Sequence, residues 1–123
     1  MLLEANGRKC DFLESVAHDL PNVTVIRGRA EEQEPDRFGV ALAKALAPPP
    51  VAAEWCLALV RPSGAAILLV GPSADAGAVA RVSVQLGGGE PEEHPGALVL
   101  PKLGPTPVGF PRRPGIARKR PLA

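Results

Sequence analysis

An uninterrupted apolar run, Ala65 to Val70, constrains the fold of this 123-residue chain more than any other feature of the sequence. A strand that is apolar at every position is typical of the middle of a parallel sheet, where both faces are covered. Parallel strands need long crossover connections, which helices usually supply. The run therefore predicts an α/β fold in which this strand is buried on both sides.

Short strands and amphipathic helices alternate around this run. Helices are predicted for residues 8–20, 51–60 and 73–86, and strands for 2–3, 23–26, 38–42, 65–70 and 97–100. In the first helix we expect one buried stripe, formed by Phe12, Leu13, Val16, Ala17 and Leu20. Pro101 cannot donate to a ladder, so it should restrict the last strand to a sheet edge. This order predicts βαβ units on one open, mainly parallel sheet.

The charges are unevenly distributed along the chain. Residues 94–123 hold six Lys or Arg and no acid, whereas residues 1–93 hold eight Lys or Arg and thirteen acids. Because the end of the chain is also rich in proline, we predict a domain over residues 1–103 and an extended basic tail over 104–123. Such a tail suits a polyanion, since each neutralised phosphate releases counterions. A solvated, disordered terminus explains the same composition.

Composition also bears on redox state, membranes and base stacking. Cys10 and Cys56 each fall in an apolar helical pattern with no His or Cys at ligand spacing, which favours buried thiols over a disulfide or a metal site. No stretch approaches ~18 consecutive apolar residues, so we expect no membrane span, and we expect a reducing, cytoplasmic setting. Aromatic residues make up 3% of the chain, which disfavours base stacking on an aromatic platform.

Six short blocks occur in an order that resembles the bacterial 16S rRNA guanine-N7 methyltransferases, the glucose-inhibited division protein B family. The blocks are residues 2–13 (LLEANGRKCDFL), 28–32 (GRAEE), 43–48 (AKALAP), 59–64 (LVRPSG), 70–73 (VGPS) and 105–116 (PTPVGFPRRPGI). The resemblance runs nearly from end to end. It implies a class I, Rossmann-like methyltransferase that uses S-adenosylmethionine to methylate N7 of a guanine in 16S ribosomal RNA.

The resemblance also implies which residues form the site. Glu4 stands where an acidic side chain accepts hydrogen bonds from ribose hydroxyls, and Ala30 with Glu31 would flank the adenine ring of the cofactor. Lys44 replaces a family arginine, which keeps the charge but loses the planar fork. Each of these could instead be an ordinary loop or helix-start residue. The basic block of the family, which would contact RNA phosphates, is matched by Arg112, Arg113, Arg118, Lys119 and Arg120.

The family chemistry needs no general base. The N7 nitrogen of guanine has a free lone pair and is itself the nucleophile, so the enzyme contributes mainly the orientation of donor and acceptor. We therefore predict no catalytic acid or base and no metal ligand. The expected partner is 16S ribosomal RNA or the small ribosomal subunit.

The sequence departs from the family pattern at its beginning. Family members carry a first strand and a glycine-rich cofactor turn before their second strand, whereas Met1 here lies almost on that second strand. Glycines 87–89 cannot replace the turn, because they end a helix instead of opening one. We therefore expect an incomplete cofactor site and a chain that is inactive alone. The alternatives are a non-catalytic RNA-associating protein and one half of a two-chain methyltransferase.

Overall fold

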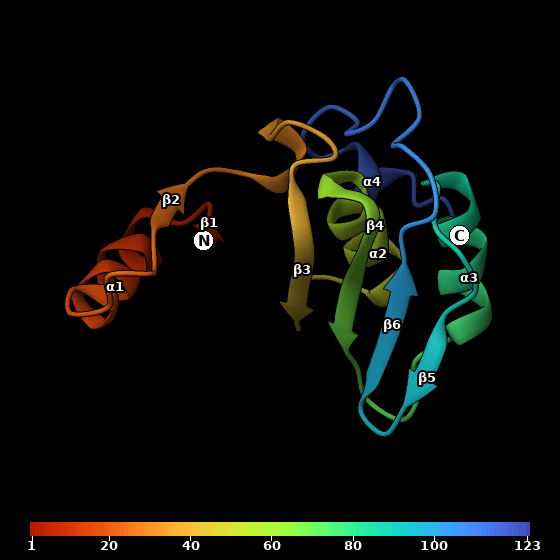
Figure 1. Cartoon of the computed structure of the whole chain (residues 1–123), viewed down its shortest axis with the longest axis horizontal. Coiled ribbons are helices and arrows are strands. Elements are labelled where there is room, and N and C mark those ends of the chain that lie inside the picture. Colours follow the sequence, from red (N-terminus) through yellow and green to blue (C-terminus); the bar gives the residue numbers. More distant parts are fainter.

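The computed structural model describes residues 1–123 and divides them into an arm and a body (Figure 1). The arm consists of β1 (Leu2–Glu4), α1 (Gly7–Ala17) and β2 (Val25–Arg27). The body begins with the 3-10 helix η1 (Ala30–Glu32) and continues through β3 (Phe38–Lys44), α2 (Pro49–Leu59), β4 (Val60–Leu69), α3 (Ala76–Gln85), β5 (Glu92–His94), β6 (Ala97–Pro101) and α4 (Ile116–Lys119). The predicted α/β class is confirmed.

Local sequence signals explain where the main helices begin. The Asn6 side chain caps α1 by accepting a hydrogen bond from the Lys9 N–H at 3.1 Å. Prolines at the first two positions of α2 fit a helical first turn, where their missing N–H groups leave no hydrogen bond unmade. The Asp75 carboxylate caps α3 through the Ala78 N–H at 3.0 Å. None of the helices is both long enough and apolar enough to cross a membrane.

The strands form two sheets instead of the single layer that we predicted. In the arm, β1 and β2 are parallel, with Leu3 opposite Ile26. In the body the strand order is β3-β4-β6-β5, with β3 parallel to β4 and β6 antiparallel to both of its neighbours. The prediction of one continuous sheet was wrong because β1 pairs only with β2 and β3 pairs only with β4. One backbone edge of β1 and one of β3 are therefore left unpaired.

The predicted edge position of β6 was also wrong, because β6 lies between β4 and β5. Pro101, the last residue of β6, is tolerated in this inner strand because β5 is short. Its three residues pair with β6 only from Ala97 to Val99, so Pro101 lies beyond the ladder with β5. On the other side Pro101 stands opposite Ala65 of β4. The missing N–H of Pro101 therefore costs the sheet no bond to β5.

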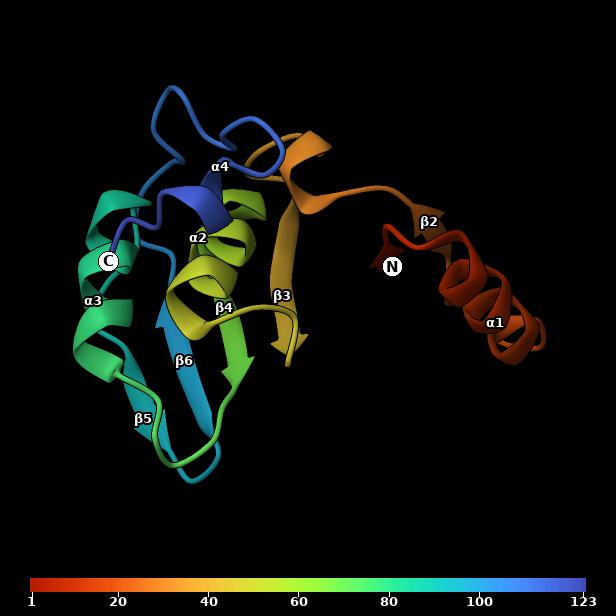
Figure 2. The same cartoon turned by 180° about the vertical axis from the view of Figure 1, so that it is seen from behind.

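The core lies on one face of the four-stranded sheet only. Ala66 and Leu68 of β4 are buried beneath α2 and α3, which both cover this face (Figure 2). Leu69, which points to the other face, is 40% exposed, and no helix of the body covers that face. The expectation that this strand is buried on both sides is therefore correct for one face and wrong for the other.

Helix α1 likewise buries only part of its predicted stripe. Cys10 is buried against the end of β1, and its thiol donates to the Glu4 carbonyl at 3.1 Å. Phe12, Val16 and Leu20 are 65%, 59% and 51% exposed. The small β1–β2 sheet is too narrow to cover the whole apolar side of the helix. This part of the burial prediction was wrong.

A buried polar cluster of Asp36, Lys102 and Thr106 fastens the sheet to the C-terminal residues. The Lys102 side chain is fully buried, and its Nζ donates to the carbonyls of Leu57 and Val60 at 2.6 Å each. It also donates to Thr106 Oγ1 at 2.7 Å and to Asp36 Oδ1 at 3.1 Å. The Thr106 N–H donates to the same Asp36 carboxylate at 3.0 Å. Every N–H of the buried ammonium thus has an acceptor within reach.

The same contacts set the pKa values in the polar cluster. Burial lowers the pKa of Lys102 below its usual value, and the hydrogen bond to Asp36 offsets part of that effect. Burial alone would raise the pKa of Asp36, but hydrogen bonds from Thr106 and Lys102 outweigh it and lower the pKa below its ordinary 3.8. The cluster therefore keeps the Asp36 carboxylate ionised.

Both cysteines are buried free thiols, as predicted. Cys10 is 5% exposed and Cys56 is 6% exposed. Burial raises the pKa of the Cys56 thiol to about 12, so the thiol stays protonated and packs as a small apolar side chain.

Candidate functional site

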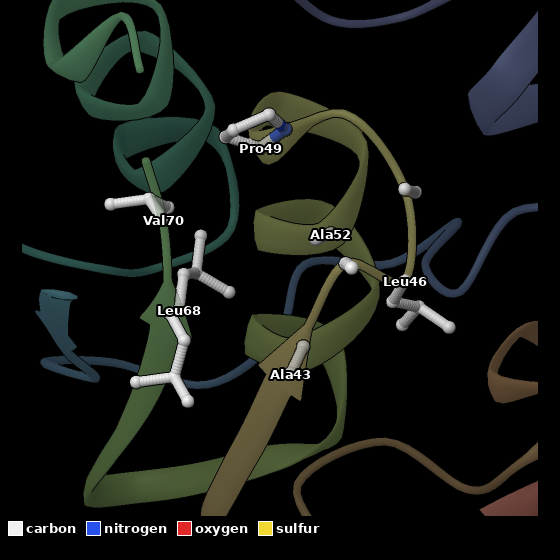
Figure 3. Close-up of a pocket in the computed structure, with 9 residues that line it drawn as sticks. Ala43, Leu46, Pro49, Ala52, Leu68 and Val70 are labelled. Carbon is white, nitrogen blue, oxygen red and sulfur yellow. The ribbon is translucent and has the colours of Figure 1, made fainter. Parts of the chain in front are cut away.

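The carboxyl ends of β3 and β4 meet at one edge of the body, where ligands bind in open α/β sheets. Lys44, the last residue of β3, stands opposite Leu69 and is exposed. A cavity of about 20 Å³ lies beside this edge (Figure 3) and is lined by Ala43, Ala45, Leu46, Ala47, Pro49, Ala52, Leu68, Leu69 and Val70. That volume suits about one water molecule, and the lining is almost entirely apolar. The cavity cannot hold a nucleoside.

Ala30 and Glu31 lie on η1, which packs against α2 on the helix-covered side of the sheet. Ala30 contacts the cluster of Val51, Trp55 and Ala117, and Ala47 packs against the same cluster. The fold thus brings Ala30 close to the segment that follows Lys44. The Glu31 side chain is only 4% exposed, and its carboxylate accepts the Gly115 N–H at 2.9 Å. Glu31 therefore holds the C-terminal residues in place and is not open to a ligand.

Glu4 lies on a different sheet from Lys44, and its carbonyl accepts the Gly28 N–H at 3.0 Å, two residues before Ala30. It ends β1 in the arm, where its Oε2 accepts the Ala5 N–H at 2.7 Å and its Oε1 lies 3.9 Å from Lys9 Nζ. Lys44 ends β3 in the body, which belongs to the other sheet. The structure therefore brings Ala30 and the Lys44 segment together on the body, while Glu4 stands on the sheet of the arm.

A second cavity, about 180 Å³, lies between the start of α2 and the C-terminal residues. It is lined by Pro48, Pro50, Val51, Arg118, Pro121 and Ala123. Sites for small molecules and cofactors usually enclose about 300–1,000 Å³. Neither of these two cavities reaches that volume, so neither encloses a donor of the size of S-adenosylmethionine, and we derive no chemical step through it.

Arg112 has a structural partner that the sequence did not reveal. Its Nε and Nη2 donate to the two carboxylate oxygens of Glu54 at 2.7 and 2.6 Å, and Nη2 also donates to the Arg120 carbonyl at 3.0 Å. The Glu54 side chain is 3% exposed, and that of Arg112 is 20% exposed. The hydrogen bond to Glu54 raises the pKa of Arg112 further above its usual value. The guanidinium is therefore largely occupied within the protein.

The other four residues of the predicted RNA-binding set are exposed: Arg113, Arg118, Lys119 and Arg120. We name these four residues the basic surface. Arg118 lies with its Cζ 5.3 Å from the centre of the Trp55 ring and donates to the Leu46 carbonyl at 3.1 Å, so its position is fixed over α2. Residues 104–123, predicted as an extended tail, thus run back over α2 and form the short helix α4 (Figure 2). The arrangement presents four cations on one ordered segment.

Sequence reasoning missed Glu54, Lys102 and Trp55. Glu54 is the only charged residue of α2, and an isolated acid in an apolar helix is a signal that an internal partner exists. Lys102 gave no such signal, because nothing near it in the sequence marks it as buried. The Trp55 Nε1 is buried and has no hydrogen-bond acceptor. The Trp55 ring contacts the C-terminal segment through Ala117 and the Arg118 guanidinium.

Comparison with known proteins gives a consistent result. The family described as GidB, rRNA small subunit methyltransferase G, matches residues 1–92. Ribosomal RNA small subunit methyltransferase G of Synechococcus elongatus is 34% identical to this chain over 143 aligned positions, covering 99% of this chain and 58% of the relative. The protein of that name from Carboxydothermus hydrogenoformans is 38% identical, covering 99% of this chain and 60% of its own length. The chain thus spans somewhat less than two thirds of the curated relatives that it matches.

Proposed function

Because the chain belongs to the GidB family of rRNA small subunit methyltransferases, we propose that it forms part of an enzyme that methylates N7 of a guanine in 16S ribosomal RNA. The observation that carries this proposal is the family match over residues 1–92, together with relatives of the same name at 32% to 38% identity. The expected cofactor is S-adenosylmethionine, which when bound supplies an electrophilic methyl group. The expected location is the cytoplasm, where ribosomal RNA is found.

The basic surface is the proposed contact with ribosomal RNA. Arg113, Arg118, Lys119 and Arg120 project from a segment that is held by Glu31 and Glu54, so little ordering is needed when RNA binds. Contacts of this kind position a protein on the phosphate backbone without reading bases. We exclude Arg112 from this surface because its guanidinium is paired with Glu54.

The salt dependence of RNA binding tests this assignment. If four cations contact phosphates, the slope of log K against log salt should be about −2.8 for single strands and −3.6 for duplex. Arg113→Gln should reduce the magnitude of the slope by about 0.7 to 0.9. The measurement is fluorescence anisotropy with a labelled 16S rRNA fragment over a range of salt concentrations.

The matched control removes the Arg112 charge without leaving Glu54 unpaired. The double variant Glu54→Leu with Arg112→Leu replaces the buried ion pair by apolar side chains and should leave the salt slope unchanged. A slope near zero in the unmodified chain would contradict the RNA-binding proposal. If the double variant reduced the magnitude of the salt slope as much as Arg113→Gln does, Arg112 would also contact RNA and its exclusion from the basic surface would be wrong.

Glu4, Ala30, Glu31 and Lys44 are the proposed cofactor-facing residues. They would need to regroup to form a pocket, because Glu4 lies in the arm and Glu31 is bonded to Gly115. We therefore expect the chain in the described arrangement to show no saturable heat of binding with S-adenosylmethionine up to about 1 mM, the weak end of ordinary affinities. The measurement is isothermal titration calorimetry.

Micromolar binding that Glu4→Ala and Lys44→Ala both abolish would mean that the pocket forms after all. The control variant is Lys119→Ala, since Lys119 is exposed on α4 and lies outside this set.

A further inference from the structure

Helix α4 bonds to segments that follow two different strands. Gly115, which caps α4, donates its N–H to the Glu31 carboxylate at 2.9 Å. Arg118 donates to the Leu46 carbonyl at 3.1 Å (Figure 3). One short stretch of chain thus bonds to two separate parts of the body. We name these parts the η1 segment, residues 30–33, and the β3–α2 loop, residues 45–48.

Apolar packing joins α4 to the same two segments. Ala117 is 1% exposed and forms a cluster with Val51 and Trp55 of α2. Ala30 of the η1 segment and Ala47 of the β3–α2 loop both pack against this cluster. Figure 2 shows α4 lying on α2. Two hydrogen bonds and one cluster therefore hold α4 and both segments together as a unit.

The β3–α2 loop contains a backbone conformation that needs support from its surroundings. Ala45 has a φ of 51°, in the left-handed region that is unfavourable for residues with a Cβ atom. Such conformations persist only where neighbouring contacts hold them. The bond from Arg118 to Leu46, the next residue, is one of these contacts. We therefore expect the loop to loosen when α4 leaves α2.

Helix α4 also carries most of the basic surface. Arg118 and Lys119 lie on α4, Arg120 follows directly, and all three are exposed. The Arg118 guanidinium has five N–H donors and gives one of them to Leu46. It can therefore bind a phosphate and keep the bond to Leu46 at the same time. Contact with RNA and contact with the β3–α2 loop are thus compatible at one side chain.

We propose that α4 couples RNA contact to the η1 segment and the β3–α2 loop. Phosphates bound to Arg118, Lys119 and Arg120 hold α4 on α2, and α4 in turn fixes both segments. Each segment follows the carboxyl end of a strand in a parallel pair, the position where open α/β sheets bind ligands. Glu31 and Arg118 are then positioning residues, because they transmit the RNA contact without reacting.

The physical basis of the coupling is an equilibrium between docked and released α4. Short segments held by few contacts open locally more easily than the core. Docked α4 presents its three cations together, whereas RNA must order them when α4 is released. RNA therefore binds the docked state more tightly and shifts the equilibrium towards it. The inference rests on the proposed contact with RNA and adds that this contact changes the segments behind α4.

Gly115→Ala tests the link in the absence of RNA. Gly115 has a φ of 89°, and a Cβ atom added there meets no atom within 4 Å, so alanine adds backbone strain alone. The N–H of Gln33 donates to Ala30 of the η1 segment, and the N–H of Val51 donates to Pro48 of the β3–α2 loop. Hydrogen exchange at these two amides, measured by NMR, should become about fivefold to thirtyfold faster, which corresponds to the penalty for a left-handed alanine.

Gly96→Ala is the matched control. Gly96 has a φ of 77° in the turn between β5 and β6, and a Cβ atom there also meets no atom within 4 Å. The strain is similar but α4 is not involved, so exchange at Gln33 and Val51 should not change. Unchanged exchange in Gly115→Ala as well would overturn the proposal without any reference to RNA.

Adding RNA tests the coupling itself. With a 16S rRNA fragment at about 100 times its dissociation constant, exchange at Gln33 and Val51 should slow at least about tenfold, with about 100-fold as the limit for RNA that binds only docked α4. The Cys10 N–H, which donates to Asn6 in the arm, should exchange at an unchanged rate. A fragment that binds but leaves Gln33 and Val51 unchanged, or speeds their exchange, would overturn the coupling and leave the RNA contact standing. Absence of RNA binding would contradict the RNA contact, and the coupling with it.

Two substitutions of Glu31 isolate the bond to Gly115. Both Glu31→Ala and Glu31→Gln remove the carboxylate charge, but only glutamine keeps an oxygen that can accept the Gly115 N–H. When RNA binds, the slowing at Gln33 should be about threefold to tenfold smaller in Glu31→Ala than in Glu31→Gln, the contribution of one hydrogen bond. Exchange at Val51 should slow equally in both, and the salt slope of RNA binding should be the same. Equal slowing at Gln33 in the two variants would overturn the role of Glu31 and with it the coupling to the η1 segment.

Discussion

Replacing Lys102 with methionine is expected to lower the free energy of unfolding by about 3 kcal/mol, the lower end of the range for breaking a buried ion pair. Methionine roughly preserves the volume of the lysine but has no donor. It leaves the carbonyls of Leu57 and Val60 and the carboxylate of Asp36 without their common partner. Asp36 is 29% exposed, so water replaces part of the lost contact, which is why we take the lower end.

Urea denaturation followed by circular dichroism measures this effect. The matched control is Lys119→Met, an exposed lysine on α4 for which we expect a change within about 0.5 kcal/mol. Similar unfolding midpoints for the two variants would show that the polar cluster contributes nothing to stability.

The pH dependence of the same variant gives an independent readout. The pKa of Asp36 lies below its ordinary 3.8 in the folded chain. Its ionised form therefore adds stability that is fully present above 3.8 and is lost as the pH falls through the lower folded value. Without the Lys102 ammonium the pKa of Asp36 should move up. The gap between its folded and unfolded pKa then narrows, so the loss of stability between about pH 5 and the acid range that Asp36 contributes should be smaller in Lys102→Met than in the unmodified chain.

Arg112→Ala is expected to cost about 3 kcal/mol, because it leaves the buried Glu54 carboxylate without a partner. Glu54 is 3% exposed, so water cannot replace the two hydrogen bonds that Arg112 donates. The loss should be concentrated in residues 104–123, since this pair and the Glu31 bond to Gly115 hold that segment on α2. Hydrogen exchange of C-terminal peptides, measured by mass spectrometry, should show lost protection there.

Two matched variants define the control for this prediction. Arg113→Ala removes the neighbouring exposed arginine and should leave hydrogen exchange unchanged. The double variant Glu54→Leu with Arg112→Leu should recover much of the protection, because it leaves no buried charge without a partner. Equal exchange in Arg112→Ala and Arg113→Ala would mean that the ion pair does not hold the segment.

Local sequence patterns were sufficient for the individual elements. The prolines before Val51 marked the start of α2, and Asn6 marked the start of α1, because capping and first-turn geometry depend on a few adjacent residues. The apolar run from Ala65 to Val70 correctly indicated the central strand. The run also predicted that both faces of this strand are covered, and the structure covers only one. Coverage depends on which elements pack against a strand, and the strand's own sequence does not determine that.

The candidate site was less predictable, since its contacts join distant parts of the chain. Five basic residues were grouped from composition and family resemblance, but only Arg113, Arg118, Lys119 and Arg120 are exposed. The partner of Arg112 lies 58 positions away on another element. Glu4 was expected beside Lys44 on the assumption of one continuous sheet, and that assumption failed at the unpaired edge of β3.

The polar cluster also sets the order in which the chain can acquire its structure. Asp36 can bond to Thr106 only after 70 further residues have been made. By contrast, β3, α2 and β4 contact elements that are adjacent to them in the sequence, so they can pack earlier. At roughly 5–20 residues per second, a ribosome needs about 4 to 14 s to make the intervening chain. During those seconds the Asp36 carboxylate has neither its Lys102 nor its Thr106 partner. Lys102 is made 66 positions after Asp36, so the polar cluster can close only after β3, α2 and β4 have all been synthesised.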